Sequence, residues 1–300
     1  MYEFLEKSFP LIKRVRGYRL YTNNNEKYLD FYQEGGKAIL GSKPRGFSLA
    51  LKNEIEKSNF YNYPSGYLRK IEKGISKLAE ECSVNISYFK TEEEMCRFVS
   101  EKEGKKYSLC KNIDCDHDVL GKNNSQTQSS AGVIRSQQAT GSSGGLIYSW
   151  FPFCGSSLKH YLNNFTYVLP VFPFPGDIAP IVLLSSNICI KNNYIPSPVV
   201  LSGLNNIIYN IIRFLEEVPY IHWREYISMF NKIWRAKGPY LIPVYKKEVH
   251  ELIFKNFLKN KILIQPCFGQ MSVLPAEISE GERILFLDTA YNIIRSLTDG

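Results

Sequence analysis

The feature that most constrains the fold is a stretch near the N-terminus, residues 17–44, in which glycines and a proline interrupt aromatic and aliphatic positions. The segment around Leu20 and the run Tyr28–Phe31 fit short strands, and the asparagine-rich turn between them tolerates positive φ angles. The glycine pair that begins at Gly35 allows backbone conformations that other residues avoid, and Pro44 ends the stretch. The sequence therefore predicts a β-hairpin followed by a connecting segment without regular secondary structure.

Composition limits the class of protein. Three hundred residues with 44% hydrophobic content can bury a sizeable core. The net charge of +8 is spread thinly, with no basic tract or nucleic-acid motif, so we expect no nucleic-acid partner. No apolar run reaches transmembrane length and the N-terminus lacks a signal peptide's apolar centre, so we expect a cytoplasmic protein without membrane contact. Seven scattered cysteines without a C-x-x-C pair predict reduced thiols.

Hydrophobic periodicity predicts both helices and strands. Helices are predicted at 46–59, at 67–82, from Thr91 onward, and at 197–217, 223–234 and 247–260. Strands are predicted at 86–89, 146–151, 167–169, 181–184, 240–244, 262–266 and 283–287. The run Ile-Val-Leu-Leu at 181–184 is the strongest candidate for a buried strand.

The segment that follows the strand at 86–89 predicts a helix that caps itself. Thr91 is in position to be the N-cap, and Glu94 completes a capping box. Glu92, Glu93 and Glu94 place three carboxylates at this terminus, where they satisfy the helix dipole and repel an anion. We therefore expect no phosphate site at this helix.

Residues 100–145 differ in character from the rest of the chain. From Gly121 to Gly145 the sequence is dominated by Ser, Gly, Gln, Asn and Thr, which predicts a flexible loop or surface excursion. Just before it, Cys115 and His117 lie among aspartates and are candidate zinc ligands. Adjacent ligands on one strand rarely converge, and no second cluster supplies the remaining ligands. We therefore expect no metal site.

The order of these pieces resembles the sequence of class III aminotransferases, which are fold-type I pyridoxal-phosphate (PLP) enzymes. The N-terminal positions that carry the resemblance are Gly17, Leu20, Tyr28, Leu29, Asp30, Phe31, Leu40 and Gly41. Thr22, Asn25 and Ser42 depart from that pattern, and Pro44 arrives one residue early. Near the other end, the helix at 197–217 and the Lys-Ile-Leu-Ile-Gln-Pro element resemble the helix after the catalytic lysine and a small-domain segment. The resemblance covers roughly 8–100 and 196–295.

This resemblance implies the fold and its division into domains. The expected fold is α/β, with a three-layer, mostly parallel sheet in a large domain of the PLP-transferase type. A small α+β lobe is expected to form from the N-terminal hairpin and the C-terminal segment. The expected regions are an arm and hairpin at 1–45, a reduced large domain at 46–215 with a loop at about 121–145, and the C-terminal lobe at 216–300. The resemblance also implies a homodimer.

In the resembled family, the chemistry needs a phosphate cup, a ring-stacking aromatic, an acid for the pyridine nitrogen and a Schiff-base lysine. The three glutamates occupy the cup position, no Tyr-His-Gly-like or Phe-His-Gly-like element occurs between 105 and 145, and Asp177 precedes a strand instead of ending one. Lys191 is the only lysine in 160–231 and so the only Schiff-base candidate. Arg283 stands where the resemblance places an arginine that binds a substrate carboxylate, although a surface strand-end arginine is an alternative.

Because the middle of the chain lacks these four parts, we expect a degenerate aminotransferase-like protein that has lost PLP-dependent catalysis. Such a protein would hold no cofactor and would serve in binding or assembly. One alternative is an active, divergent PLP-dependent aminotransferase acting on an amino acid or amino sugar, with Lys191 as the nucleophile. A further alternative is an unrelated interaction protein.

Overall fold

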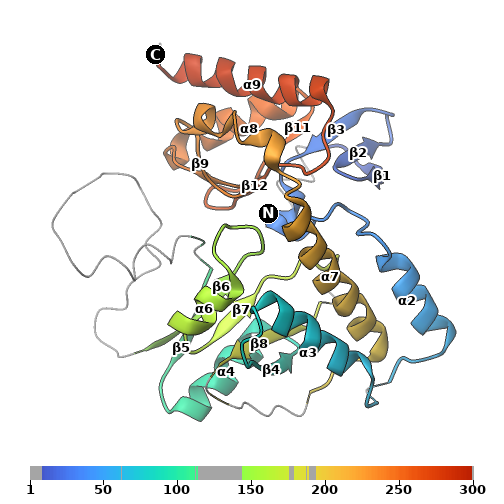
Figure 1. Ribbon diagram of the computed structural model, residues 1–300. Helices are drawn as coiled ribbons and strands as arrows, with labels where there is room; N and C mark the ends of the chain where they lie inside the picture. Colours follow the sequence, from blue (N-terminus) through green and yellow to red (C-terminus); the bar gives the residue numbers. More distant parts are fainter. Residues whose placement is uncertain are drawn as a thin grey trace. The chain divides into compact units, whose positions relative to one another are not determined.

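The computed structural model describes residues 9–61, 63–111, 113, 144–175, 179–186, 188 and 194–298. Two compact units divide these residues. The central unit spans residues 44–216, and the terminal unit combines the N-terminal residues up to 43 with residues 217 onward. Figure 1 shows the elements of both.

The central unit contains one five-stranded sheet and its helices. Its helices are α2 (Phe47–Glu56), α3 (Tyr67–Leu78), α4 (Glu92–Glu103), α6 (Leu158–Asn164) and α7 (Pro198–Glu217). Its strands are β4 (Asn85–Phe89), β5 (Tyr107–Cys110), β6 (Gly145–Trp150), β7 (Val168–Pro170) and β8 (Ile181–Ser185). The strand order is β4-β8-β7-β6-β5. β5, β6 and β7 are parallel, and both β4 and β7 are antiparallel to β8. Four of the five strands therefore run in one direction, which confirms the expected α/β class with a mostly parallel sheet.

Helices cover both faces of this sheet. On one face, Met95 and Val99 of α4 pack with Ile147 of β6 and its neighbours. Trp150 lies three residues beyond Ile147 in the same strand and so points to the opposite face. There it lines a hollow together with residues of α3 and α7. A sheet buried on both faces needs continuous apolar strands, which explains the Ile-Val-Leu-Leu run of β8.

The terminal unit contains two small sheets and two long helices. Its strands are β1 (Ile12–Arg16), β2 (Arg19–Thr22), β3 (Lys27–Asp30), β9 (Trp234–Lys237), β10 (Tyr240–Pro243), β11 (Ile262–Leu263) and β12 (Ser272–Val273). Its helices are α8 (His250–Lys259) and α9 (Glu280–Thr298), with short 3-10 turns η1 (Gln33–Gly36), η2 (Ile221–Trp223), η3 (Ile227–Phe230) and η4 (Lys247–Val249). The sheets have the strand orders β1-β2-β3-β11 and β12-β10-β9.

Backbone pairing joins the two ends of the chain within this unit. β3 runs parallel to β11, and the Leu29 and Phe31 N–H groups each donate to a carbonyl of the C-terminal segment at 2.8 Å. The Phe31 ring stacks on Phe286 of α9, with centroids 4.1 Å apart. Phe286 is fully buried and also stacks on Trp234. The aromatic core of the terminal unit is therefore built from both ends of the sequence.

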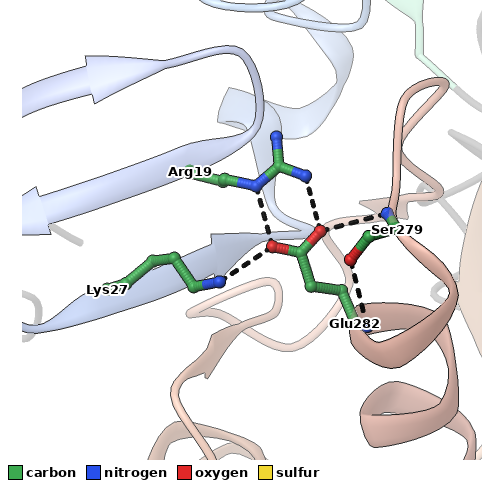
Figure 2. Close-up of polar contacts among 4 residues, drawn as sticks. All are labelled: Arg19, Lys27, Ser279 and Glu282. Carbon is green, nitrogen blue, oxygen red and sulfur yellow. Dashed lines mark hydrogen bonds and ion pairs between the residues drawn. The ribbon is translucent and has the colours of Figure 1, made fainter.

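A buried carboxylate adds a second link between the ends. Glu282, near the start of α9, accepts hydrogen bonds from Arg19 Nε at 2.7 Å and Arg19 Nη2 at 2.6 Å. Its Oε1 also lies 3.0 Å from Lys27 Nζ, and its Oε2 accepts from the Ser279 N–H at 3.1 Å. Figure 2 shows the four residues, with both cations from the N-terminal hairpin.

Two predicted elements are wrong. The strand expected at 283–287 is part of α9. Ser279 and Glu282 exchange backbone-to-side-chain hydrogen bonds at 3.1 and 3.4 Å, so a capping box starts a helix there and overrides the β-like apolar run. The helix expected at 223–234 consists of η2, η3 and the start of β9, because Trp234 enters the ladder with β10.

Glycine permits a close contact between two helices of the central unit. A Cβ added to Gly74 of α3 would lie 2.7 Å from Cγ2 of Ile208 on α7. Ile208 is fully buried and β-branched, so its side chain cannot readily move aside. The two helices can approach this closely only because residue 74 has no side chain.

We expect Gly74→Ala to destabilise the protein by about 1–2 kcal/mol, because overpacking outweighs the helix propensity that alanine adds. The matched control is Gly281→Ala in α9, whose added Cβ meets nothing within 4 Å. The control should leave stability unchanged or raise it by up to about 1 kcal/mol. Urea unfolding measures both. Equal effects at the two sites would contradict the close contact.

The segment that follows the N-terminal hairpin, residues 33–36, forms a turn in the left-handed region of φ/ψ space. Gln33, Glu34, Gly35 and Gly36 have φ angles of 46°, 49°, 66° and 102°. The Asp30 carboxylate accepts the N–H groups of Tyr32 at 3.0 Å and of Gln33 at 2.8 Å, which holds the start of the turn. Burial raises the pKa of Asp30 to about 6, although these two N–H donors lower it.

Because the folded-state pKa of Asp30 lies above its unfolded value, this group stabilises the fold fully below about pH 4 and loses that contribution as the pH rises through about 6. Asp30→Asn keeps an acceptor oxygen and removes the ionisation. Relative to wild type, we expect this variant to gain about 1–3 kcal/mol of stability between pH 4 and pH 7. Urea unfolding across that range measures the difference. A difference that does not vary with pH would contradict the raised pKa.

Candidate functional site

The candidate site is the edge of the central sheet at which the parallel strands end. In open α/β sheets, ligands bind outside the carboxyl ends of the strands. β4, β5, β6 and β7 all end at this edge. The segments that follow them are Lys90–Glu94, Lys111, Phe151–Ser157 and Val171–Pro175.

The first of these segments forms the N-terminus of α4. Thr91 Oγ1 accepts the Glu94 N–H at 3.1 Å, and Glu94 Oε2 accepts the Lys90 N–H at 3.1 Å. Glu92 Oε2 lies 2.6 Å from Lys111 Nζ, at the end of β5. Thr91 thus caps the N–H of Glu94, and Glu94 binds the N–H of Lys90 just before the helix. The prediction of a self-capped helix is confirmed.

This terminus does not fit a phosphate group. A phosphate site needs free backbone N–H groups and a positive local field. Glu92, Glu93 and Glu94 bring three negative charges, and Lys111 balances only one of them by direct contact. A phosphate placed here would be repelled by the two remaining carboxylates. The cofactor implied by the sequence resemblance therefore finds no phosphate cradle at α4.

A hollow of about 390 Å³ lies where β6 ends. The residues that line it are Lys77, Leu78, Glu80, Trp150, Phe153, Gly155, Ser156, Ser157, Leu158, Ile212, Leu215 and Glu216. Its apolar wall includes Trp150, Leu158 and Ile212, all buried. Trp150 Nε1 donates to the Ser156 carbonyl at 3.0 Å, which fixes the loop after β6.

The charged groups at this hollow are paired. Lys77 Nζ lies 2.9 Å from a Glu216 carboxylate oxygen, and Glu80 accepts from Lys159 at 3.3 Å. All four side chains are substantially exposed. The described lining therefore offers an apolar wall between ion pairs, which suits binding of an apolar group. Sequence reasoning missed this hollow, since its residues come from α3, the end of β6, α6 and α7.

Arg283 lies in α9 of the terminal unit, and its guanidinium group is engaged there. It forms an ion pair with Glu280, and its Cζ lies 4.9 Å from the centroid of the Tyr226 ring. The bond to Glu280 raises the pKa of Arg283. These contacts describe a structural arginine. Its role in binding a substrate carboxylate stays a prediction.

The other predicted site residues lie outside the described residues. These are Cys115, His117, Asp177 and Lys191. The described segments after β6 and β7, residues 151–157 and 171–175, contain neither lysine nor an acidic residue. Within the described ranges, no three His, Cys, Asp or Glu side chains gather closely enough to bind a metal ion. Nor does any described helix combine the length and apolarity needed to cross a bilayer.

Comparison with known sequences gives relatives without an assigned activity. No protein-family model matches the chain. A protein of Borreliella burgdorferi described as uncharacterized is 25% identical over 301 residues, which cover 100% of this chain and 97% of that protein. A Treponema pallidum protein with the same description is 39% identical over 49 residues, 16% of each chain.

Solved structures of aminotransferases share the fold. An ornithine aminotransferase from Plasmodium yoelii aligns with a TM-score of 0.66 and 13% identity over 95% of this chain and 93% of its own. An acetylornithine aminotransferase from Elizabethkingia anophelis aligns with a TM-score of 0.63 and 13% identity over 98% of each chain. A glutamate-1-semialdehyde aminomutase from Pseudomonas aeruginosa aligns with a TM-score of 0.62 and 10% identity. The alignment covers 94% of this chain and 87% of the aminomutase chain. The predicted likeness to class III aminotransferases is confirmed as a likeness of fold.

We expect Thr91→Ala to destabilise the protein by about 1 kcal/mol, because the Glu94 N–H loses its acceptor. Thr91→Ser keeps a hydroxyl at the same position and is the matched control. It should retain most of the wild-type stability. Thermal unfolding of the two variants measures the difference. An alanine variant as stable as the serine variant would show that the cap contributes nothing.

Proposed function

We propose that this chain is an aminotransferase-like protein that has lost PLP-dependent catalysis and acts in binding or assembly. The proposal rests on the polar contacts and charges at the N-terminus of α4. There Thr91 Oγ1 accepts the N–H of Glu94, and the first turn carries three carboxylates, those of Glu92, Glu93 and Glu94. A dinegative phosphate has no favourable place there.

The sequence after the parallel strands supports the same proposal. PLP enzymes hold the cofactor covalently through a lysine in a desolvated pocket and balance the ring nitrogen with an acid. The described segments after β6 and β7 contain neither residue type. Lys191 follows β8, the one strand of the sheet that runs against the others.

Binding is supported by the hollow at the end of β6. Its wall of Trp150, Leu158 and Ile212 can bury an apolar group of a small molecule or of a partner's side chain. The ion pairs Lys77–Glu216 and Lys159–Glu80 beside it can orient a polar end of the same ligand. A binding function needs no catalytic group at this hollow.

Assembly as a homodimer is supported by an aromatic segment of the central unit. Phe60, Tyr61 and Tyr63 are 54%, 68% and 66% exposed. Three large aromatic side chains this close together in the chain and this exposed are typical of a protein interface. A second copy of the chain is the partner that the fold likeness favours.

The alternative is an active PLP-dependent aminotransferase on an amino acid or amino sugar. It is favoured by one sequence observation, that Lys191 is the only lysine between 160 and 231. In that case Lys191 would bind PLP covalently.

Incubation with PLP followed by gel filtration separates the two proposals. We expect wild type to emerge without the visible absorption band of lysine-bound PLP, because α4 offers no phosphate site. Lys191→Ala is the matched control for reaction at surface lysines. A band that borohydride removes in wild type and that is missing from Lys191→Ala would contradict the proposal. A weak band of equal size in both proteins would identify surface labelling and leave the proposal standing.

A further inference from the structure

A chain of buried hydrogen bonds starts at His250, the first residue of α8. His250 is only 8% exposed, and both nitrogens of its ring have partners. Nε2 lies 3.2 Å from the Pro266 carbonyl oxygen, and Nδ1 lies 3.0 Å from the Tyr245 hydroxyl. Because a carbonyl only accepts hydrogen bonds, Nε2 must carry a proton. In the neutral ring Nδ1 is then the acceptor, and the Tyr245 hydroxyl donates to it.

The chain continues through Gln265 to β12. Gln265 Nε2 donates to the Tyr245 hydroxyl oxygen at 2.8 Å, and Gln265 Oε1 accepts from the Ser272 hydroxyl. Ser272 Oγ in turn accepts the Gln265 N–H at 2.9 Å. Gln265 and Ser272 are fully buried. With the His250 ring neutral, the hydroxyl groups of Tyr245 and Ser272 therefore both have an acceptor.

Protonation of His250 is incompatible with this arrangement. A proton added to Nδ1 would meet the hydroxyl hydrogen of Tyr245, so that hydrogen must turn away from the ring. The Gln265 amide contacts the same hydroxyl, and it can accept from Tyr245 only after turning Oε1 toward it. Gln265 Nε2 would then face Ser272, and the Ser272 hydroxyl would lose its acceptor. A buried hydroxyl without an acceptor destabilises the structure around it.

We propose that His250 is a pH sensor, whose protonation reverses this chain of hydrogen bonds and loosens residues 265–274. That segment contains β12, which pairs with β10. The Val273 N–H donates to the Phe31 carbonyl at 2.6 Å, and the Val273 carbonyl accepts from Gln33 Nε2 at 3.2 Å. A change at His250 therefore reaches the end of the N-terminal hairpin and the left-handed turn that follows it.

The groups that face His250 keep its ring neutral. Tyr245 is a titratable group in contact with the ring, and burial raises the pKa of its hydroxyl well above the usual range. Phe254 of α8 and Phe268 of the segment after β11 present uncharged rings. Cys267 is the titratable residue beside Phe268, and Glu251, next in α8, is exposed. Among the described residues, no charged side chain of α9 or of another element contributes to the pKa of His250.

The sign of the pH effect follows from burial. Burial lowers the pKa of His250 below its ordinary value of about 6.5, although the bond to the Pro266 carbonyl raises it. Because the folded-state pKa lies below the unfolded value, neutral His250 contributes its full stability above about pH 6.5, and this contribution is lost as the pH falls through the folded-state pKa. Asp30 has the opposite dependence, so the two groups must be separated by variants.

Hydrogen exchange measured by mass spectrometry at about pH 7.5 and about pH 5, on either side of the ordinary histidine pKa, tests the proposal. His250→Gln can supply a donor for the Pro266 carbonyl and cannot be protonated. On acidification, we expect peptides covering 265–274 to lose about fivefold or more protection in wild type relative to His250→Gln, because a buried hydroxyl is left unpaired. Asp30 titrates in both proteins, so its effect cancels in this comparison. His160→Gln, at a histidine of the central unit, is the matched control and should behave like wild type.

Two further measurements test the chain itself. Tyr245→Phe cuts the chain between the His250 ring and Gln265, and it should remove most of the pH effect on residues 265–274. Long-range ¹H–¹⁵N NMR at the higher pH should show the His250 proton on Nε2. Any of three results would overturn the proposal: equal loss of protection in wild type and His250→Gln, a full pH effect in Tyr245→Phe, or a neutral ring with its proton on Nδ1.

Discussion

The terminal unit depends on the ionised carboxylate of Glu282. Burial alone would raise the pKa of Glu282, but the bonds from Arg19, Lys27 and Ser279 lower it to about 2. The carboxylate therefore stays charged while only 8% of the residue is exposed. Removal of Arg19 would take two hydrogen bonds from this buried charge, which is more costly than the loss of a surface ion pair. Arg19 and Glu282 are 263 positions apart in the chain, so this single group connects the N-terminal hairpin to the start of α9 (Figure 2).

The same capping chemistry has different consequences in the two units. At α9, the capping box of Ser279 and Glu282 starts a helix and also supplies the anion that the hairpin binds. At α4, Thr91 accepts the Glu94 N–H and Glu94 accepts the Lys90 N–H. Glu92 and Glu93 add charge there, at a position where the resembled enzymes would bind a phosphate. Overall fold and site chemistry are constrained by different residues. The sheet and its helices therefore have an aminotransferase-like arrangement, while the start of α4 carries three carboxylates.

Much of the fold could be predicted because periodicity and capping act locally. The Ile-Val-Leu-Leu run gave β8, and Thr91 with Glu94 gave the start of α4. The prediction of a strand at 283–287 was wrong because it followed the β-like residues of that run. The capping signal of Ser279 and Glu282, which begins four residues earlier, predicts the helix that the structure has. The hollow at β6 could not be predicted, since α3, β6, α6 and α7 meet only after folding. The left-handed turn could be predicted only in part from the sequence. Gly35 and Gly36 permit positive φ angles, but the residue types of Gln33 and Glu34 do not indicate them.

We propose that the N-terminus of α4 does not bind the phosphate of PLP. The most direct test is a crystal structure of the protein grown with excess PLP. We expect Thr91 Oγ1 to keep its bond from the Glu94 N–H, Glu94 Oε2 to keep its bond from the Lys90 N–H, and no phosphate to lie against the N–H groups of residues 92–94. A phosphate bonded to those N–H groups, with the glutamate side chains turned away, would contradict it.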